Sequence, residues 1–218
     1  MSVEYFEFED NQEPRCPVIL LCDTSGSISG EAIDALNNCL KTFCDEISTD
    51  EQASLRVDTA LVISAPVQVV QDFTAIDGFF PPKLTANAGT TMGEAIELAL
   101  DLLEKRKQVY RDNGIQYYPP WVFLITDGAP TDEWVHAAQK ARQADLDLKL
   151  RFFVVGLQGA DMSVLTQIAS VTRPPIMLNG LNFGSLFKCL FDSMPTIVSF
   201  GKVGVRIDLP PVGWGTVT

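Results

Sequence analysis

Three fragments of this sequence, rich in hydroxyl and carboxylate groups, could together bind a metal ion. The first, at residues 23–27, directly follows the apolar run at residues 18–21. Asp23, Ser25 and Ser27 are spaced by two residues, so a tight turn can aim their three side-chain oxygens at one point. Oxygen ligands without a nearby set of His or Cys favour Mg²⁺, Mn²⁺ or Ca²⁺ over zinc.

The other two fragments lie where a helix or strand is predicted to begin or end. Residues 88–93 (AGTTMG) open a long predicted helix, and residues 122–128 form a second apolar run that ends in Asp-Gly. In an open α/β sheet, ligands bind in the loops beyond the carboxyl ends of the strands. Asp and Ser are also common helix caps, so Ser27 or Ser29 could instead cap the helix that follows.

The ordered set of three fragments resembles the metal-ion-dependent adhesion site of von Willebrand factor type A domains. The similarity runs over roughly residues 14–200, which is nearly the whole chain. Within that family the chain is similar to a small intracellular bacterial branch, the tellurium-resistance-associated TerY and YegL-like proteins. That closer similarity is carried by residues 113–115 (NGI), 117–118 (YY) and 128–134 (GAPTDEW).

The resemblance implies five metal ligands, which are Asp23, Ser25, Ser27, Thr90 and Asp127. In the family, the two matching serines coordinate the metal directly and the two aspartates act directly or through water. The matching threonine joins them when a partner is bound. Thr91 is an alternative to Thr90, although the Gly-Thr-x-x-Gly pattern favours Thr90. One departure is Ile28, where the family often has methionine, and we expect this apolar side chain to pack similarly.

The same resemblance implies a binding function that depends on the metal. Mg²⁺ prefers six oxygen ligands and keeps several waters when protein ligands are few. An exchangeable water leaves room for a carboxylate oxygen from a Glu or Asp of a partner protein. The branch further implies association with a protein kinase and a phosphatase in stress or tellurite-response complexes. The alternative is a metal-assisted hydrolase that acts on phosphoesters.

The familiar enzyme mechanisms lack their required residues in this sequence. A serine hydrolase needs a general base, and the only histidine, His136, falls within a predicted helix. An aspartyl-phosphate phosphatase needs a second carboxylate two residues after its nucleophile, whereas Ser25 stands two residues after Asp23. The sequence has no Gly-Lys-Ser/Thr phosphate loop for nucleotide hydrolysis. We therefore predict a module that is not an enzyme.

The composition favours a protein partner inside the cell. Acidic residues outnumber basic ones 28 to 16, and the resulting net charge of -12 disfavours nucleic acid and anionic membranes as partners. Residues 2–10 lack the basic and apolar regions of a signal peptide, and no apolar run approaches the about 20 residues of a membrane span. Five cysteines form no close metal-binding pair and leave one over after any disulfide pairing. We expect a cytoplasmic protein.

Apolar periodicity predicts strands that alternate with helices. The predicted strands are residues 18–21, 55–64, 67–73, 121–126, 151–156 and 176–178, and the predicted helices are residues 30–47, 91–113, 132–144, 161–170 and 183–194. The short connection Ala65-Pro66 predicts an antiparallel hairpin at one edge. Continuous apolar runs such as residues 151–156 are typical of buried parallel strands. The pattern predicts a doubly wound α/β sandwich, with helices on both faces of a mostly parallel sheet.

We expect one domain over residues 1–218, with its core at about residues 14–200. Residues 201–218 could form an edge strand or a tail. The basic residues 105–111, which end a long helix, are predicted to lie in solvent and to suit the helix dipole. The apolar stripe of the predicted helix 183–194 indicates either static core or, as in the family that the chain resembles, a helix that slides when the metal loops rearrange.

Overall fold

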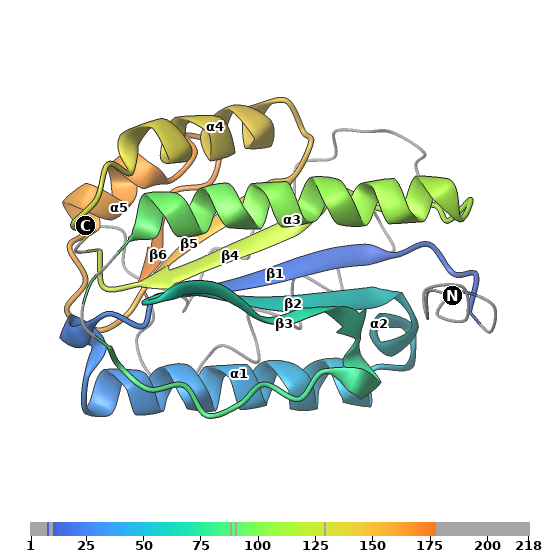
Figure 1. The fold of residues 1–218 in the computed structure, drawn as a ribbon, viewed down its shortest axis with the longest axis horizontal. Helices are drawn as coiled ribbons and strands as arrows, with labels where there is room; N and C mark the ends of the chain where they lie inside the picture. Colours follow the sequence, from blue (N-terminus) through green and yellow to red (C-terminus); the bar gives the residue numbers. More distant parts are fainter. Residues whose placement is uncertain (1–7, 9–10, 88, 90, 129, 178–218) are drawn as a thin grey trace.

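The computed structural model describes residue 8 and residues 11–87, 89, 91–128 and 130–177. In this part of the chain, strands form a single sheet in the order β3-β2-β1-β4-β5-β6 (Figure 1). The strands are β1 (Cys16–Cys22), β2 (Val57–Ser64), β3 (Val67–Ala75), β4 (Trp121–Thr126), β5 (Arg151–Gly156) and β6 (Ile176–Met177). β3 runs antiparallel to β2 and the other neighbours are parallel, which confirms the predicted mixed sheet.

Helices cover both faces of this sheet. They are α1 (Glu31–Thr49), α2 (Glu51–Arg56), α3 (Met92–Asp112), α4 (Val135–Leu146) and α5 (Met162–Ile168), with the short 3₁₀ turns η2 (Gly26–Ile28) and η3 (Ile76–Gly78). α3, α4 and α5 lie on one face, and α1 lies on the other (Figure 1). The predicted three-layer α/β sandwich is therefore confirmed. No helix in the described ranges is both long and apolar enough to cross a membrane.

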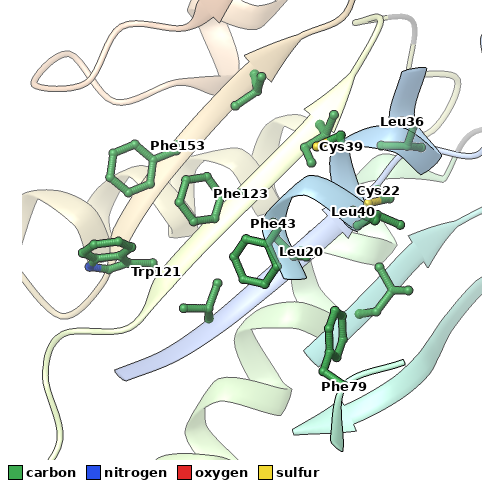
Figure 2. Packing of buried hydrophobic residues seen from close by; sticks show 14 of the residues in the cluster. Leu20, Cys22, Leu36, Cys39, Leu40, Phe43, Phe79, Trp121, Phe123 and Phe153 are labelled. Atoms are coloured by element: carbon green, nitrogen blue, oxygen red, sulfur yellow. The ribbon is translucent and has the colours of Figure 1, made fainter. Parts of the chain in front are cut away.

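The central strands are apolar along their whole length because both of their faces are buried. In β1, Leu20 packs in the cluster that includes Phe43 of α1, whereas the next residue, Leu21, packs in the cluster on the α3 face. On the α1 face, the rings of Phe123 and Phe153 stack with centroids 4.8 Å apart (Figure 2). Such strands place polar side chains only at their ends, which is where the candidate site lies.

Two predicted elements begin two or three residues later than expected. The strand expected at residues 55–64 begins at Val57, because residues 51–56 form α2. The Asp50 carboxylate caps that short helix by accepting hydrogen bonds from the amides of Gln52 and Ala53. The helix expected at residues 132–144 begins only at Val135, since the segment before it packs against α3. The helix expected at residues 183–194 and the tail at residues 201–218 lie outside the described residues.

Contrary to the prediction, the basic stretch at residues 105–111 does not lie wholly in solvent. Arg106 is only 8% exposed because its guanidinium pairs with the buried carboxylate of Asp58, at 2.8 Å. Asp58 also accepts from Arg15, at 3.2 Å, and from the hydroxyl of Tyr110. The ring of Phe8 lies over both guanidiniums, at 5.6 and 5.3 Å. This ionic cluster lies at the start of β1 and β2, the end of the sheet away from the candidate site.

Candidate metal centre

Asp23 follows β1 and is only 1% exposed. It lies at the edge of the sheet formed by the carboxyl ends of the parallel strands. Its amide donates to the carbonyl of Ile125 at 2.8 Å, which continues the pairing of β1 with β4. Its Oδ1 accepts from the Ser25 amide at 3.0 Å and from the Ser64 hydroxyl at 2.9 Å. Its Oδ2 accepts from the Thr126 hydroxyl at 2.6 Å. Charge-assisted hydrogen bonds from the ends of β2 and β4 thus fix this carboxylate.

The hydroxyls of Ser25 and Ser27 lie next to each other at the same edge. Their Oγ atoms are 2.9 Å apart. The turn η2 produces this spacing: the Ile28 amide donates to the Ser25 carbonyl at 3.1 Å, and the fully buried Ile28 side chain anchors the turn, as predicted. Adjacent ligands of an octahedral Mg²⁺ ion, each about 2.1 Å from the metal, are separated by about 3 Å. The hydroxyl pair therefore has the spacing of two adjacent Mg²⁺ ligands.

The alternative role of these serines, as caps of the next helix, does not agree with the structure. The N-cap of α1 is Gly30, which has a positive φ of 72°, and no side chain makes a capping hydrogen bond there. The hydroxyls of Ser27 and Ser29 are therefore not used to satisfy the first amides of α1. The Ser27 hydroxyl contacts Ser25 instead.

Thr24 joins two neighbouring loops to the first fragment. Its hydroxyl donates to the Ala65 carbonyl at 3.0 Å and accepts from the Ala65 amide at 3.1 Å. Its own carbonyl accepts from the Asn87 amide at 2.8 Å. The loop that leads into α3 is thereby held against the loop that follows β1.

The second fragment is described only in part, because Thr90 lies outside the described residues. Thr91, the alternative ligand, is the N-cap residue of α3, and its hydroxyl donates to the Ser64 carbonyl at 2.9 Å. That bond gives Thr91 a structural role at the end of β2. The fragment nonetheless reaches the site, since Ser64 also donates to the Asp23 carboxylate.

The third fragment, at the end of β4, lies beside the first. Asp127 is half-buried, and its carbonyl accepts from the Asp161 amide at 2.9 Å. The next residue, Gly128, has a φ of 79°, and its amide donates to the Thr126 hydroxyl at 3.0 Å. Asp127 therefore sits one residue beyond the threonine that holds Asp23. Of the predicted ligands, Ser25 contacts Asp23 through its backbone amide and Ser27 through its hydroxyl, and Asp127 lies at the same edge.

Two residues that support the site were not singled out from the sequence, namely Ser64 and Thr126. Both end an apolar strand with a hydroxyl, and both strands neighbour β1. A polar residue that terminates a buried strand next to the strand bearing Asp23 is the signal that could have found them.

The donor set suits a hard cation. Among the described residues, no group of three or more His, Cys, Asp or Glu could hold a metal ion, so the oxygens come mainly from hydroxyls. Burial raises the pKa of the Cys22 thiol, and the neighbouring Asp23 carboxylate raises it further, which disfavours a thiolate ligand. His136 is 74% exposed on α4, where its Nδ1 lies 3.5 Å from Glu97. This chemistry fits Mg²⁺, Mn²⁺ or Ca²⁺.

Comparisons with known proteins agree with this arrangement. A model of the von Willebrand factor type A domain matches residues 18–188. Matrilin-3 of Gallus gallus is 24% identical over 157 residues, which are 70% of this chain and 34% of matrilin-3, so the chain spans about a third of that relative.

Solved structures of other proteins share the fold, and two of them contain a metal ion. One is manganese-loaded TRAP of Plasmodium vivax, with a TM-score of 0.56 and 18% identity over 79% of this chain and 71% of that chain. The other is proximal thread matrix protein 1 from the mussel byssus, with zinc in its metal-ion-dependent adhesion site. Its TM-score is 0.54, with 17% identity over 84% of this chain and 48% of that chain.

Proposed function

Because the chain belongs to the von Willebrand factor type A domain family, we propose that it binds a partner protein through a divalent cation at the edge described above. Domains of this family are binding modules, and they generally bind proteins through a metal-ion-dependent adhesion site. The proposed ligands are Asp23, Ser25, Ser27, Thr90 and Asp127. Manganese in TRAP and zinc in the byssus protein support a divalent ion, and the hydroxyl-rich donor set favours Mg²⁺, Mn²⁺ or Ca²⁺.

The observation that carries this proposal is the pair of hydroxyls 2.9 Å apart on Ser25 and Ser27, beside a carboxylate that is already held in place. The hydroxyls of Thr126 and Ser64 orient the Asp23 carboxylate through hydrogen bonds. A bound cation would supply a positive charge with an exchangeable water, which a carboxylate can replace. The chain's own residues supply the orientation, so little rearrangement is needed when the ion binds.

The charge around the site explains why a carboxylate partner would need the metal. Residues 23–34, 85–97, 126–135 and 156–166, which form the loops and first helical turns at this edge, contain no Lys or Arg. They carry several exposed acidic side chains, namely Glu31, Glu94, Glu133 and Asp161, and also Asp34, which lies 3.6 Å from the exposed Lys83 ammonium. Without a cation this edge repels an acidic side chain, and with one it attracts it. We propose that the partner presents a single Asp or Glu among basic residues, which complement the acidic rim.

The resemblance of residues 113–118 and 128–134 to the TerY and YegL-like branch supports a finer proposal. On that basis we place the protein in the bacterial cytoplasm, in a complex that responds to stress or tellurite. A protein kinase and a phosphatase are the proposed members of that complex. This extension rests on the sequence resemblance alone.

Affinity capture from the source cells tests the proposed function. The tagged wild-type protein should retain a specific partner in Mg²⁺ and lose it in EDTA, and the Ser25→Ala/Ser27→Ala variant should retain none. Ser29→Ala is the matched control, because this exposed serine lies two residues away and is not a proposed ligand. Equal capture with and without Mg²⁺ would contradict the proposal. Mg²⁺-dependent phosphoester hydrolysis that disappears in Ser25→Ala would favour the alternative hydrolase.

A further inference from the structure

The first turn of α3 is capped by a residue from another loop. Asp132 Oδ2 accepts hydrogen bonds from the amide of Gly93 at 2.8 Å and from the amide of Glu94 at 3.2 Å. These are the second and third amides of the helix, which an N-cap side chain ordinarily satisfies. Asp132 is 39 residues away in the sequence, in the segment between β4 and α4. Its negative charge also suits the positive end of the helix dipole.

Thr91, the N-cap residue of α3, does not cap the helix because its hydroxyl makes a different hydrogen bond. Thr91 makes no side-chain capping bond, and its hydroxyl donates to the Ser64 carbonyl at the end of β2. The beginning of α3 is therefore held from two sides: by β2 through Thr91, and by the segment before α4 through Asp132. In the sequence, the proposed ligand Thr90 directly precedes this doubly held turn.

The absence of a side chain at Gly93 makes the contact with Asp132 possible. A Cβ atom at this position would lie 2.7 Å from the Glu133 carbonyl oxygen and 2.8 Å from the Trp134 Cα. Both are backbone atoms, which cannot move aside cheaply. The segment 132–134 thus packs against the helix backbone itself. This packing explains why residues 132–134 stay outside α4, although the sequence pattern predicts that the helix begins at Asp132.

These bonds join the three fragments of the candidate site into a closed ring. Asp23 connects to Ser64 and to Thr126 through hydroxyls, and Ser64 connects to Thr91 at the start of α3. Asp132 closes the ring, because it links the start of α3 to the chain that follows Asp127. The other oxygen of Asp132, Oδ1, is buried and has no hydrogen-bond partner among the described residues. Burying a carboxylate oxygen without a hydrogen-bond partner costs free energy, so Asp132 is not placed here for its own stability.

We propose that Asp132 is a positioning residue of the metal site: it holds the start of α3, at residues 91–94, against the segment that follows Asp127. The inference rests on the proposed function, which assigns ligands next to both of these segments in the sequence. Asp132 is not one of the proposed ligands. Residues that orient metal ligands commonly change metal affinity on the order of 10-fold to 100-fold when they are removed.

The test is a Mg²⁺ titration of the full chain in three variants. Asp132→Ala should raise the dissociation constant on the order of tenfold. Asp132→Asn should restore most of the affinity, because its amide oxygen can still accept from Gly93 and Glu94. Asp50→Ala is the matched control, since Asp50 caps α2 with the same pair of bonds at the opposite edge of the sheet. Asp50→Ala should lower thermal stability but leave the Mg²⁺ affinity unchanged.

Hydrogen exchange of the Gly93 and Glu94 amides, measured without metal, separates this inference from the proposed function. Exchange of both amides should accelerate in Asp132→Ala and not in Asp50→Ala. If the wild type binds Mg²⁺ and Asp132→Ala binds it equally well, the positioning role is overturned while the proposed function stands. If the wild type binds no divalent ion, the proposed function and the positioning role are both wrong, even if the exchange data confirm that Asp132 caps α3.

Discussion

The hydroxyl of Thr126 donates a 2.6 Å hydrogen bond to Asp23 Oδ2, across 103 residues of sequence. This bond joins the end of β4 to the end of β1, so the first and third fragments of the candidate site are held next to each other. The same Thr126 oxygen accepts from the Gly128 amide, which shapes the turn around Asp127. Thr126 therefore acts on both proposed aspartate ligands without being one of them.

Thr126→Val should weaken both the fold and the metal site. The buried Asp23 carboxylate would lose a charge-assisted bond, at a cost of about 1.5–3 kcal/mol in the free energy of unfolding. Metal affinity should fall on the order of tenfold, because the ligand loses its orientation. Urea unfolding and calorimetric Mg²⁺ titration measure the two effects.

Thr59→Val is the control for that substitution. Thr59 is a fully buried threonine in β2, and its hydroxyl has no hydrogen-bond partner among the described residues. Replacing this hydroxyl by a methyl group should not lower stability and should not change metal affinity. Equal losses in Thr126→Val and Thr59→Val would show that the bond to Asp23 has no special role.

At the other end of the sheet, Asp58→Asn should be strongly destabilising. The carboxylate neutralises Arg15 and Arg106, whose side chains are only 3% and 8% exposed. Removing one partner of a buried ion pair typically costs about 3–5 kcal/mol, because the remaining charge is left uncompensated. Asp45→Asn, which removes an exposed pair with Lys41, should leave the urea midpoint unchanged. A midpoint for Asp58→Asn equal to that of the wild type would contradict this account.

Tyr110 should make the free energy of unfolding depend on pH in the alkaline range. Burial raises the pKa of its hydroxyl, and the neighbouring Asp58 carboxylate raises it further. Since the folded-state pKa is above the unfolded value of about 10, the stabilising contribution is complete below about pH 10 and is lost as the pH rises further.

The difference in unfolding free energy between wild type and Tyr110→Phe should therefore shrink above about pH 10, by up to about 1.4 kcal/mol per pH unit. Urea titrations of both proteins between about pH 8 and pH 11 measure it. The variant is the appropriate reference because all other titrating groups remain. A difference that stays constant over this range would show that Tyr110 ionises equally in both states.

Phe8 should anchor the beginning of the chain to the ionic cluster. It is 5% exposed, packs edge-on against Tyr110 and lies over Arg15 and Arg106. Phe8→Ala should cost about 3 kcal/mol in unfolding free energy. Phe8→Leu, which keeps an apolar side chain but loses the cation–π contacts, should cost about 1 kcal/mol. A Phe8→Leu variant as stable as the wild type would mean that the aromatic ring has no specific role.

The sequence was sufficient to predict what depends on local patterns. Continuous apolar runs identified β4 and β5 to the residue, and the Ala65-Pro66 connection identified the antiparallel edge. The adhesion-site fragments predicted which loops would meet, because the carboxyl ends of neighbouring parallel strands share an edge. The direct contact between Ser25 and Ser27 follows from their spacing and one tight turn.

Two of the errors come from partners that are distant in the sequence. Arg106 was predicted to lie in solvent because nothing near it showed that Asp58, 48 residues away, would face it. Asp132 has the residue type of a cap at the start of its own helix, but it caps α3 instead. In both cases a carboxylate satisfies groups on another element, and only the packing of helices on the sheet brings them together.

Calorimetric titration of the metal-free protein with Mg²⁺ and with Mn²⁺ tests the central claim most directly. The wild type should bind one ion, and Asp23→Ala and Asp127→Ala should each lose that binding while circular dichroism shows that both remain folded. Unchanged affinity in both variants would contradict the proposed site.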